Sequence, residues 1–98
     1  MFGNKWRGGV LLRELTTTIK AKTGLHARPA AALVNSIAKF KSQVTIIKEE
    51  QEANLKSILG LLSLSVEQHD TVTIRAEGKD EDQVIAALNN CAAEHGLW

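Results

Sequence analysis

Cysteine is nearly absent from this sequence of 98 residues. A single thiol, Cys91, can form neither an intramolecular disulfide nor a cluster of cysteine metal ligands. Such sparing use of cysteine is typical of a reducing cytoplasm. Because Cys91 falls on the apolar side of a predicted helix, we expect it to be a buried, inert thiol.

Aromatic residues and net charge are also scarce, and both shortages argue against nucleic acid as a partner. Aromatic residues make up 4% of the chain and the formal net charge is +1. Binding to a polyphosphate usually needs a clearly basic face, and RNA recognition needs exposed rings on which bases stack. Binding of RNA by an α+β domain is therefore only a minor alternative for the function of this chain.

Long hydrophobic runs are missing as well. No segment approaches the roughly 20 apolar residues that span a bilayer, and the apolar run Val10–Leu12 is too short for the core of an export signal. We therefore expect a cytoplasmic protein without a membrane association. With 44% hydrophobic and 23% charged residues, the chain is long enough for one globular domain.

Two parts of the chain differ in pattern. Residues 1–12 are rich in glycine and basic residues, and we interpret them as an N-terminal extension that is partly disordered or pairs with a neighbour. Residues 13–98 carry regular periodicities and form the predicted domain. The expected state is a monomer, with a dimer through the extension as the alternative.

The periodicities of residues 13–98 predict an α+β fold. Alternating apolar residues indicate strands at 15–22, 43–47, 52–55 and 71–76, whereas apolar spacings of three and four indicate helices at 27–40, 57–64 and 80–96. Asp80 and Gln83 resemble a capping box, and Gly96 is a natural helix end. The order βαββαβα predicts an open-faced sandwich, in which three helices cover one face of a four-stranded antiparallel sheet.

His26 is the first candidate for chemistry, because it stands where a glycine-containing loop meets a predicted helix. The first turn of a helix offers free N–H groups and a positive dipole end, which bind anions. Arg28 adds a guanidinium that can hold two phosphoryl oxygens at once. An imidazole is also a nucleophile near neutral pH. The alternative is a histidine that merely caps the helix, with Arg28 in solvent.

Ser57 is the second candidate, at the head of a short apolar helix. Ile58, Leu59 and Leu62 fall on one side of that helix, whereas Leu61 and Leu64 fall on another. One side can cover the sheet, which leaves the other as an exposed docking surface. The alternatives are that both sides are buried and that Ser57 is only a helix cap.

Three segments in order resemble the HPr family, the histidine phosphocarriers of the bacterial sugar phosphotransferase system. Gly24–Ala31 resembles the active-site motif, Asn54–Gly60 the regulatory serine segment, and Ala76–Glu81 the last strand-to-helix corner. The resemblance covers about residues 13–96. The turn at 48–52 and the loop at 66–70 depart from it, because they lack the glycine or asparagine usual there.

A free-standing enzyme is the least expected function, because no second acid–base group or metal cluster accompanies His26 in the sequence, and we expect no cofactor or metal. The resemblance implies a phosphoryl carrier. His26 would accept a phosphoryl group from enzyme I on Nδ1 and pass it to an EIIA domain. Arg28, with the backbone N–H groups of Ala27 and Arg28, would hold the phosphate. Ile58, Leu59 and Leu62 would bind these partners.

The resemblance also implies control at Ser57, through phosphorylation by an HPr kinase/phosphorylase and binding of a catabolite control regulator. A purely regulatory HPr-like protein that acts through phosphorylated Ser57, without phosphoryl carriage, is the alternative function. His69 and His95 are interpreted as solvated residues with no chemical role.

Overall fold

The computed structural model describes residues 2–7 and 10–98, with side chains from Leu12 onward. Within these residues the chain forms strands and helices in the order ββαββαβα. The elements are β1 (Phe2–Arg7), β2 (Val10–Thr18), α1 (Ala27–Ile37), β3 (Gln43–Lys48), β4 (Gln51–Asn54), α2 (Ile58–Ser63), β5 (Thr71–Glu77) and α3 (Glu81–His95).

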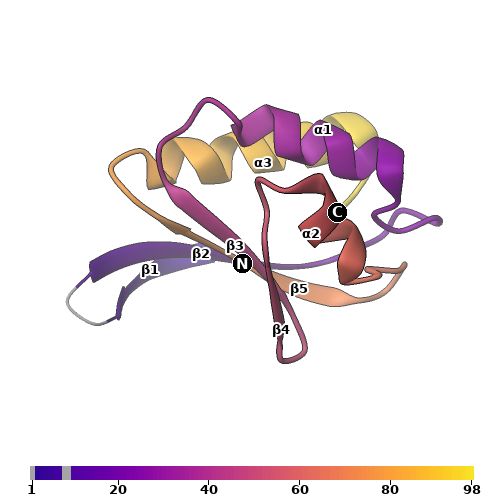
Figure 1. The fold of residues 1–98 in the computed structure, drawn as a ribbon, viewed down its shortest axis with the longest axis horizontal. Coiled ribbons are helices and arrows are strands. Elements are labelled where there is room, and N and C mark those ends of the chain that lie inside the picture. The colour runs from indigo at the N-terminus through magenta and orange to yellow at the C-terminus, as the bar shows by residue number, and fades with distance from the viewer. Residues whose placement is uncertain (1, 8–9) are drawn as a thin grey trace.

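The described strands form one antiparallel sheet in the order β1-β2-β5-β3-β4. Helices α1 and α3 lie side by side over one face, and α2 packs against α1 and β4 (Figure 1). The predicted open-faced sandwich is thus confirmed in β2, β5, β3 and β4, and β1 lengthens the sheet at its β2 edge. Within residues 2–7 and 10–98, no helix is long and apolar enough to cross a bilayer.

The core lies between the helices and the covered face of the sheet. Along β5 every second residue is buried, as the alternation predicts: Val72, Ile74 and Ala76. The apolar stripe of α1 belongs to the same core cluster through Leu33 and Ile37, which are fully buried. Because each such aliphatic side chain contributes roughly 1.5–3 kcal/mol on burial, this layer holds α1, and the loop before it, in place.

The N-terminal segment is part of the sheet. β1 pairs with β2 from Phe2 opposite Leu15 to Arg7 opposite Val10. The expected division between residues 1–12 and 13–98 therefore falls inside β2. Residues 2–7 show no clear alternation of apolar and polar side chains, so the pattern gave no strand there. Residues 1, 8 and 9 of the extension, and the side chain of Trp6, lie outside the described part.

The capping box predicted at Asp80 and Gln83 is wrong. Asp80 precedes α3, but its carboxylate makes no cap bond. Instead it accepts hydrogen bonds from the backbone N–H groups of Lys41, at 2.7 Å, and Ser42, at 2.9 Å, as well as from the Ser42 hydroxyl. Gly78 permits this approach, because a Cβ there would stand 2.7 Å from the Ser42 Cα. Asp80 thus ties the loop after α1 to the start of α3.

These bonds make an acid-dependent contribution to stability. The Ser42 hydroxyl, followed by the Lys41 N–H, lowers the pKa of the Asp80 carboxyl below its ordinary value. A lowered folded-state pKa stabilises the protein above the unfolded pKa of about 4, and this stabilisation is lost as pH falls through the folded value. Asp80→Asn is therefore expected to lower the free energy of unfolding at pH 7, by an amount that shrinks at pH 3. Urea unfolding at both pH values measures this.

Asp82→Asn is the matched control for that experiment. Asp82 is an exposed carboxylate in the first turn of the same helix and bonds Arg13 at 2.6 Å rather than the loop after α1. If the two variants lost the same stability at both pH values, the acid dependence would be a general charge effect and the assignment to Asp80 would fail.

Candidate functional site

His26 ends the loop that leads into α1, and its side chain is exposed. It occupies the N-cap position with extended backbone (φ −83°, ψ −171°), yet its ring makes no capping bond. The alternative is therefore wrong in that the His26 side chain does not cap the helix, although Arg28 is exposed, as that alternative expected. The ring is left free to contact another molecule.

Thr23 fixes the ring of His26 from one side. The Oγ1 of Thr23 lies 2.8 Å from Nε2 of His26. In the tautomer in which Nε2 carries the proton and donates it to this oxygen, Nδ1 presents an unshared lone pair. Sequence reasoning missed Thr23, although a hydroxyl three residues before a loop histidine was the available signal.

The first turn of α1 supplies donors beside the ring. Pro29 has no N–H, and the N–H of Ala30 donates to the His26 carbonyl at 2.9 Å. The amides of Ala27 and Arg28 stand at the helix start, where no intrahelical acceptor exists. With the exposed guanidinium of Arg28, they form a set of donors suited to an anion.

The loop before His26 is held rigidly against the loop that precedes β5. Gly24 has φ +66°, and a Cβ there would lie 2.3 Å from the Val66 carbonyl oxygen, so only glycine fits. That same carbonyl accepts the N–H of Leu25 at 3.0 Å, and the Leu25 side chain is buried. The buried leucine and the close backbone approach together fix where His26 stands.

His26 and Arg28 line one pocket of about 310 Å³. A second histidine, His95 from the last turn of α3, lines it too. His95 is exposed, as expected of a solvated residue, and the fold alone brings it into this pocket, because 69 residues separate it from His26 in the sequence. The full lining is Ala21, Thr23, Gly24, His26, Arg28, Pro29, His95 and Leu97.

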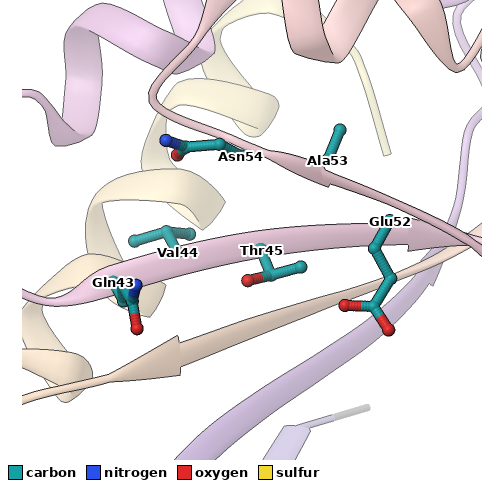
Figure 2. Close-up of a pocket in the computed structure, with 6 residues that line it drawn as sticks. All are labelled: Gln43, Val44, Thr45, Glu52, Ala53 and Asn54. Atoms are coloured by element: carbon teal, nitrogen blue, oxygen red, sulfur yellow. The ribbon is translucent and has the colours of Figure 1, made fainter.

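Another pocket, of about 280 Å³, lies along β3 and β4 (Figure 2). Its lining residues are Gln43, Val44, Thr45, Glu52, Ala53 and Asn54. Among them Glu52 alone is ionisable, and none of the sequence-predicted site residues belongs to it. It offers no cluster of groups for acid–base or nucleophilic chemistry.

Helix α2 has an exposed apolar surface. The sequence alone did not decide whether one side of this helix is exposed or both sides are buried. Leu61 and Leu64 are buried, whereas Leu59 is 81% exposed and Ile58 38% exposed. Leu62 is half-buried. The alternative in which both sides are buried is therefore wrong. We call Ile58, Leu59 and Leu62 the α2 patch.

Ser57 caps α2, and its hydroxyl oxygen accepts the N–H of Gly60 at 3.1 Å. Helix α2 packs against α1 and lies near the N-terminal end of α1 in Figure 1. The patch and Ser57 therefore belong to a helix that lies against α1. The sequence alone gave no indication of this proximity.

An exposed histidine at a helix start, an arginine two residues on and an apolar patch on a helix that packs against α1 are features suited to binding an anion and a protein. The family model for the HPr component phosphorylation site of the phosphotransferase system matches residues 13–94. The chain belongs to the HPr family. HPr proteins are phosphocarriers that interact with components of the phosphotransferase system in sugar transport.

Several HPr relatives resemble most of the chain. The phosphocarrier protein HPr of Mycoplasma genitalium is 38% identical over 81 residues, 82% of this chain and 92% of its own. A solved mycoplasma histidine-containing phosphocarrier has a TM-score of 0.83 at 38% identity, and the match covers 86% of this chain and 96% of that one. Crh of Bacillus subtilis, a catabolite repression protein solved as a dimer with a swapped domain, has a TM-score of 0.66 at 40% identity, covering 80% and 90%.

Proposed function

We propose that this chain carries a phosphoryl group on Nδ1 of His26, between enzyme I and sugar-specific EIIA domains in the cytoplasm. The observation that supports this most is the exposure of the His26 ring together with its hydrogen bond to Thr23. The ring is exposed, makes no capping bond, and meets Thr23 through Nε2. Nδ1 is the nitrogen left available for a bond to phosphorus.

The transfer conserves charge and protons without any further group. The Nδ1 lone pair attacks the phosphorus of phosphorylated enzyme I, and the bond between phosphorus and its donor atom on enzyme I breaks as the Nδ1–P bond forms. In the tautomer that carries its proton on Nε2, that proton stays in place, and Nε2–H keeps its hydrogen bond to Thr23 Oγ1 throughout the transfer. Transfer to EIIA repeats this in reverse, with the EIIA nucleophile attacking and Nδ1 of His26 leaving.

The surrounding donors position the phosphoryl group and balance its charge. The amides of Ala27 and Arg28 and the Arg28 guanidinium face an anion of about −2 charge, in a transfer whose catalysis rests on positioning and electrostatics. Because His26 and Arg28 are exposed, two different proteins can reach the phosphorus in turn. An enclosed enzyme pocket would prevent that relay.

The α2 patch is the proposed docking surface for both partners. Leu59 is far more exposed than Ile58, so its truncation removes contact area without disturbing the core. Leu59→Ala is expected to weaken enzyme I binding about tenfold, the effect of losing an apolar anchor, with the free energy of unfolding changed by less than about 0.5 kcal/mol. Titration calorimetry against enzyme I and urea unfolding measure the two quantities.

Gln83→Ala is the control for this truncation, because Gln83 is an exposed residue near the start of α3. It should leave the enzyme I affinity unchanged. Equal affinities of Leu59→Ala and the unmodified protein would exclude the α2 patch as the docking surface.

Regulation at Ser57 is the second part of the proposal. An HPr kinase/phosphorylase would phosphorylate the hydroxyl, and a catabolite control regulator would bind the product. Ser57 caps α2 at the edge of the patch, and phosphate is tolerated electrostatically at a helix N-terminus. The new charge would therefore alter the docking surface rather than the fold.

A regulatory protein that uses only Ser57 is the competing function, favoured by the similarity to Crh. An assay with enzyme I and phosphoenolpyruvate separates the two. Acid-labile, base-stable label on His26 supports carriage, whereas the absence of label with an active enzyme I supports the regulator. The retained His26 and Arg28, in one pocket, favour carriage.

A further inference from the structure

His95 stands in the pocket of the phosphoryl acceptor without a role in the transfer described above. It is the last residue of α3 and lines the same pocket as His26 and Arg28. The side chain is exposed. Among the described residues it has no hydrogen bond or ion pair, so both ring nitrogens are available to a ligand.

The C-terminal residues hold His95 in this position. Gly96 ends α3 in the left-handed conformation (φ +65°). The Leu97 side chain is buried, its N–H donates to the Ala92 carbonyl at 2.8 Å, and its carbonyl accepts the N–H of Lys20 at 2.9 Å. The end of α3 is thereby tied to the segment that leads into the His26 loop, so a fixed backbone carries the His95 ring.

The pocket has the composition of an anion site. Its ionisable lining residues are Arg28 and the two histidines, with no carboxylate among them. A phosphoryl group on His26 would add close to two negative charges to this space. A neutral imidazole donates one hydrogen bond and an imidazolium donates two, so His95 can contribute a donor in either form.

We propose that His95 donates a hydrogen bond to an oxygen of the phosphoryl group carried by His26, and so stabilises the phosphorylated protein. This inference rests on the proposed function of His26. It assigns His95 as a phosphate-binding side chain supplied by the opposite end of the chain. Since the bond exists only when His26 is phosphorylated, His95 would favour the phosphorylated over the free carrier.

Removal of His95 tests this through the phosphoryl equilibrium. His95→Ala is expected to shift the equilibrium between phosphorylated enzyme I and this protein about tenfold toward enzyme I, as for the loss of one hydrogen bond to a charged group. His95→Gln, which keeps a donor, should recover part of the shift. Quench-flow with labelled phosphoenolpyruvate gives the equilibrium, and nitrogen NMR of the ring of His95 should show a shift when His26 is phosphorylated.

His69→Asn is the control, because His69 is exposed, does not line the pocket, and has φ +77°, a conformation that asparagine tolerates. It should leave the equilibrium unchanged. If unmodified protein is labelled on His26 while His95→Ala keeps the same equilibrium and the His95 ring signals stay still, this inference is overturned and the carrier function stands. Failure of the unmodified protein to accept phosphoryl from enzyme I overturns both.

Discussion

His26→Ala is expected to abolish uptake of phosphoryl from enzyme I, because the substitution removes the nitrogen that we propose forms the bond to phosphorus. Alanine offers no nucleophile, and neither Arg28 nor Thr23 can replace an imidazole as a reversible phosphoryl acceptor. Incorporation of label from phosphoenolpyruvate, read as acid-labile and base-stable product, should fall to background. This is the largest single effect that the site predicts.

The fold should survive this substitution. The His26 side chain is exposed and makes no capping bond, so its removal breaks only the contact with Thr23. We expect the free energy of unfolding to change by less than about 0.5 kcal/mol, which urea unfolding measures. A loss of uptake accompanied by an intact fold therefore reports on chemistry alone.

His69→Asn again supplies the control, since it removes an imidazole from a different loop. It should accept phosphoryl at the rate of the unmodified protein. Label retained by His26→Ala at the level of the unmodified protein would place the acceptor elsewhere and contradict the proposed carrier role.

The regular elements were predictable because their side chains repeat with the period of the structure. The alternation around Val72 and Ile74 and the stripe from Ala30 to Ile37 both follow from burial on one face. The ends of the elements were less predictable than the elements themselves. The first long strand was expected to reach residue 22, but β2 ends at Thr18. Beyond it Lys20 bonds Leu97, a partner that no local pattern reveals.

Asp80 shows why a local motif can be misleading. Its position before an acidic first turn is typical of a helix cap, and only the approach of the loop after α1 gives the carboxylate better partners. β1 is a comparable case, since its pairing with β2 depends on hydrogen bonds between backbones rather than on a pattern of side chains. Tertiary contacts therefore determine both the hydrogen-bond partners of Asp80 and the pairing of β1 with β2.

In the candidate site, too, some residues could be predicted from the local sequence, whereas others depend on tertiary contacts. His26, Arg28 and Pro29 are neighbours in sequence, so their chemistry could be inferred from the helix start that they share. Thr23 was overlooked within the same loop. His95 could not have been placed by sequence, because its position depends on the packing of α3 over the sheet and on the anchoring of Leu97.

Ser57→Asp is expected to weaken enzyme I binding by about tenfold or more while it leaves the fold intact. Aspartate is as good an N-cap as serine, so its carboxylate can accept the Gly60 N–H that Ser57 accepts now. The added charge stands next in sequence to Ile58 and Leu59, which are exposed and belong to the proposed docking surface. Docking would then bury an uncompensated carboxylate against an apolar surface, which is costly.

The neighbouring cation does not remove that cost. Lys56 precedes Ser57, but its ammonium group donates to the Phe40 carbonyl and is thereby held by the loop after α1. The charge of an aspartate, or of a phosphate, at position 57 would remain at the edge of the α2 patch. Titration calorimetry against enzyme I should show the loss of affinity, and thermal unfolding should show no loss of stability.

Ser57→Asn separates charge from shape in this experiment. Asparagine matches aspartate in size and caps helices equally well, but it is neutral. We therefore expect Ser57→Asn to bind enzyme I as the unmodified protein does, and the difference between the two variants to measure electrostatics at the patch. Equal weakening in both would mean that side-chain bulk, rather than charge, disturbs docking, and phosphorylation would then lose its proposed electrostatic basis.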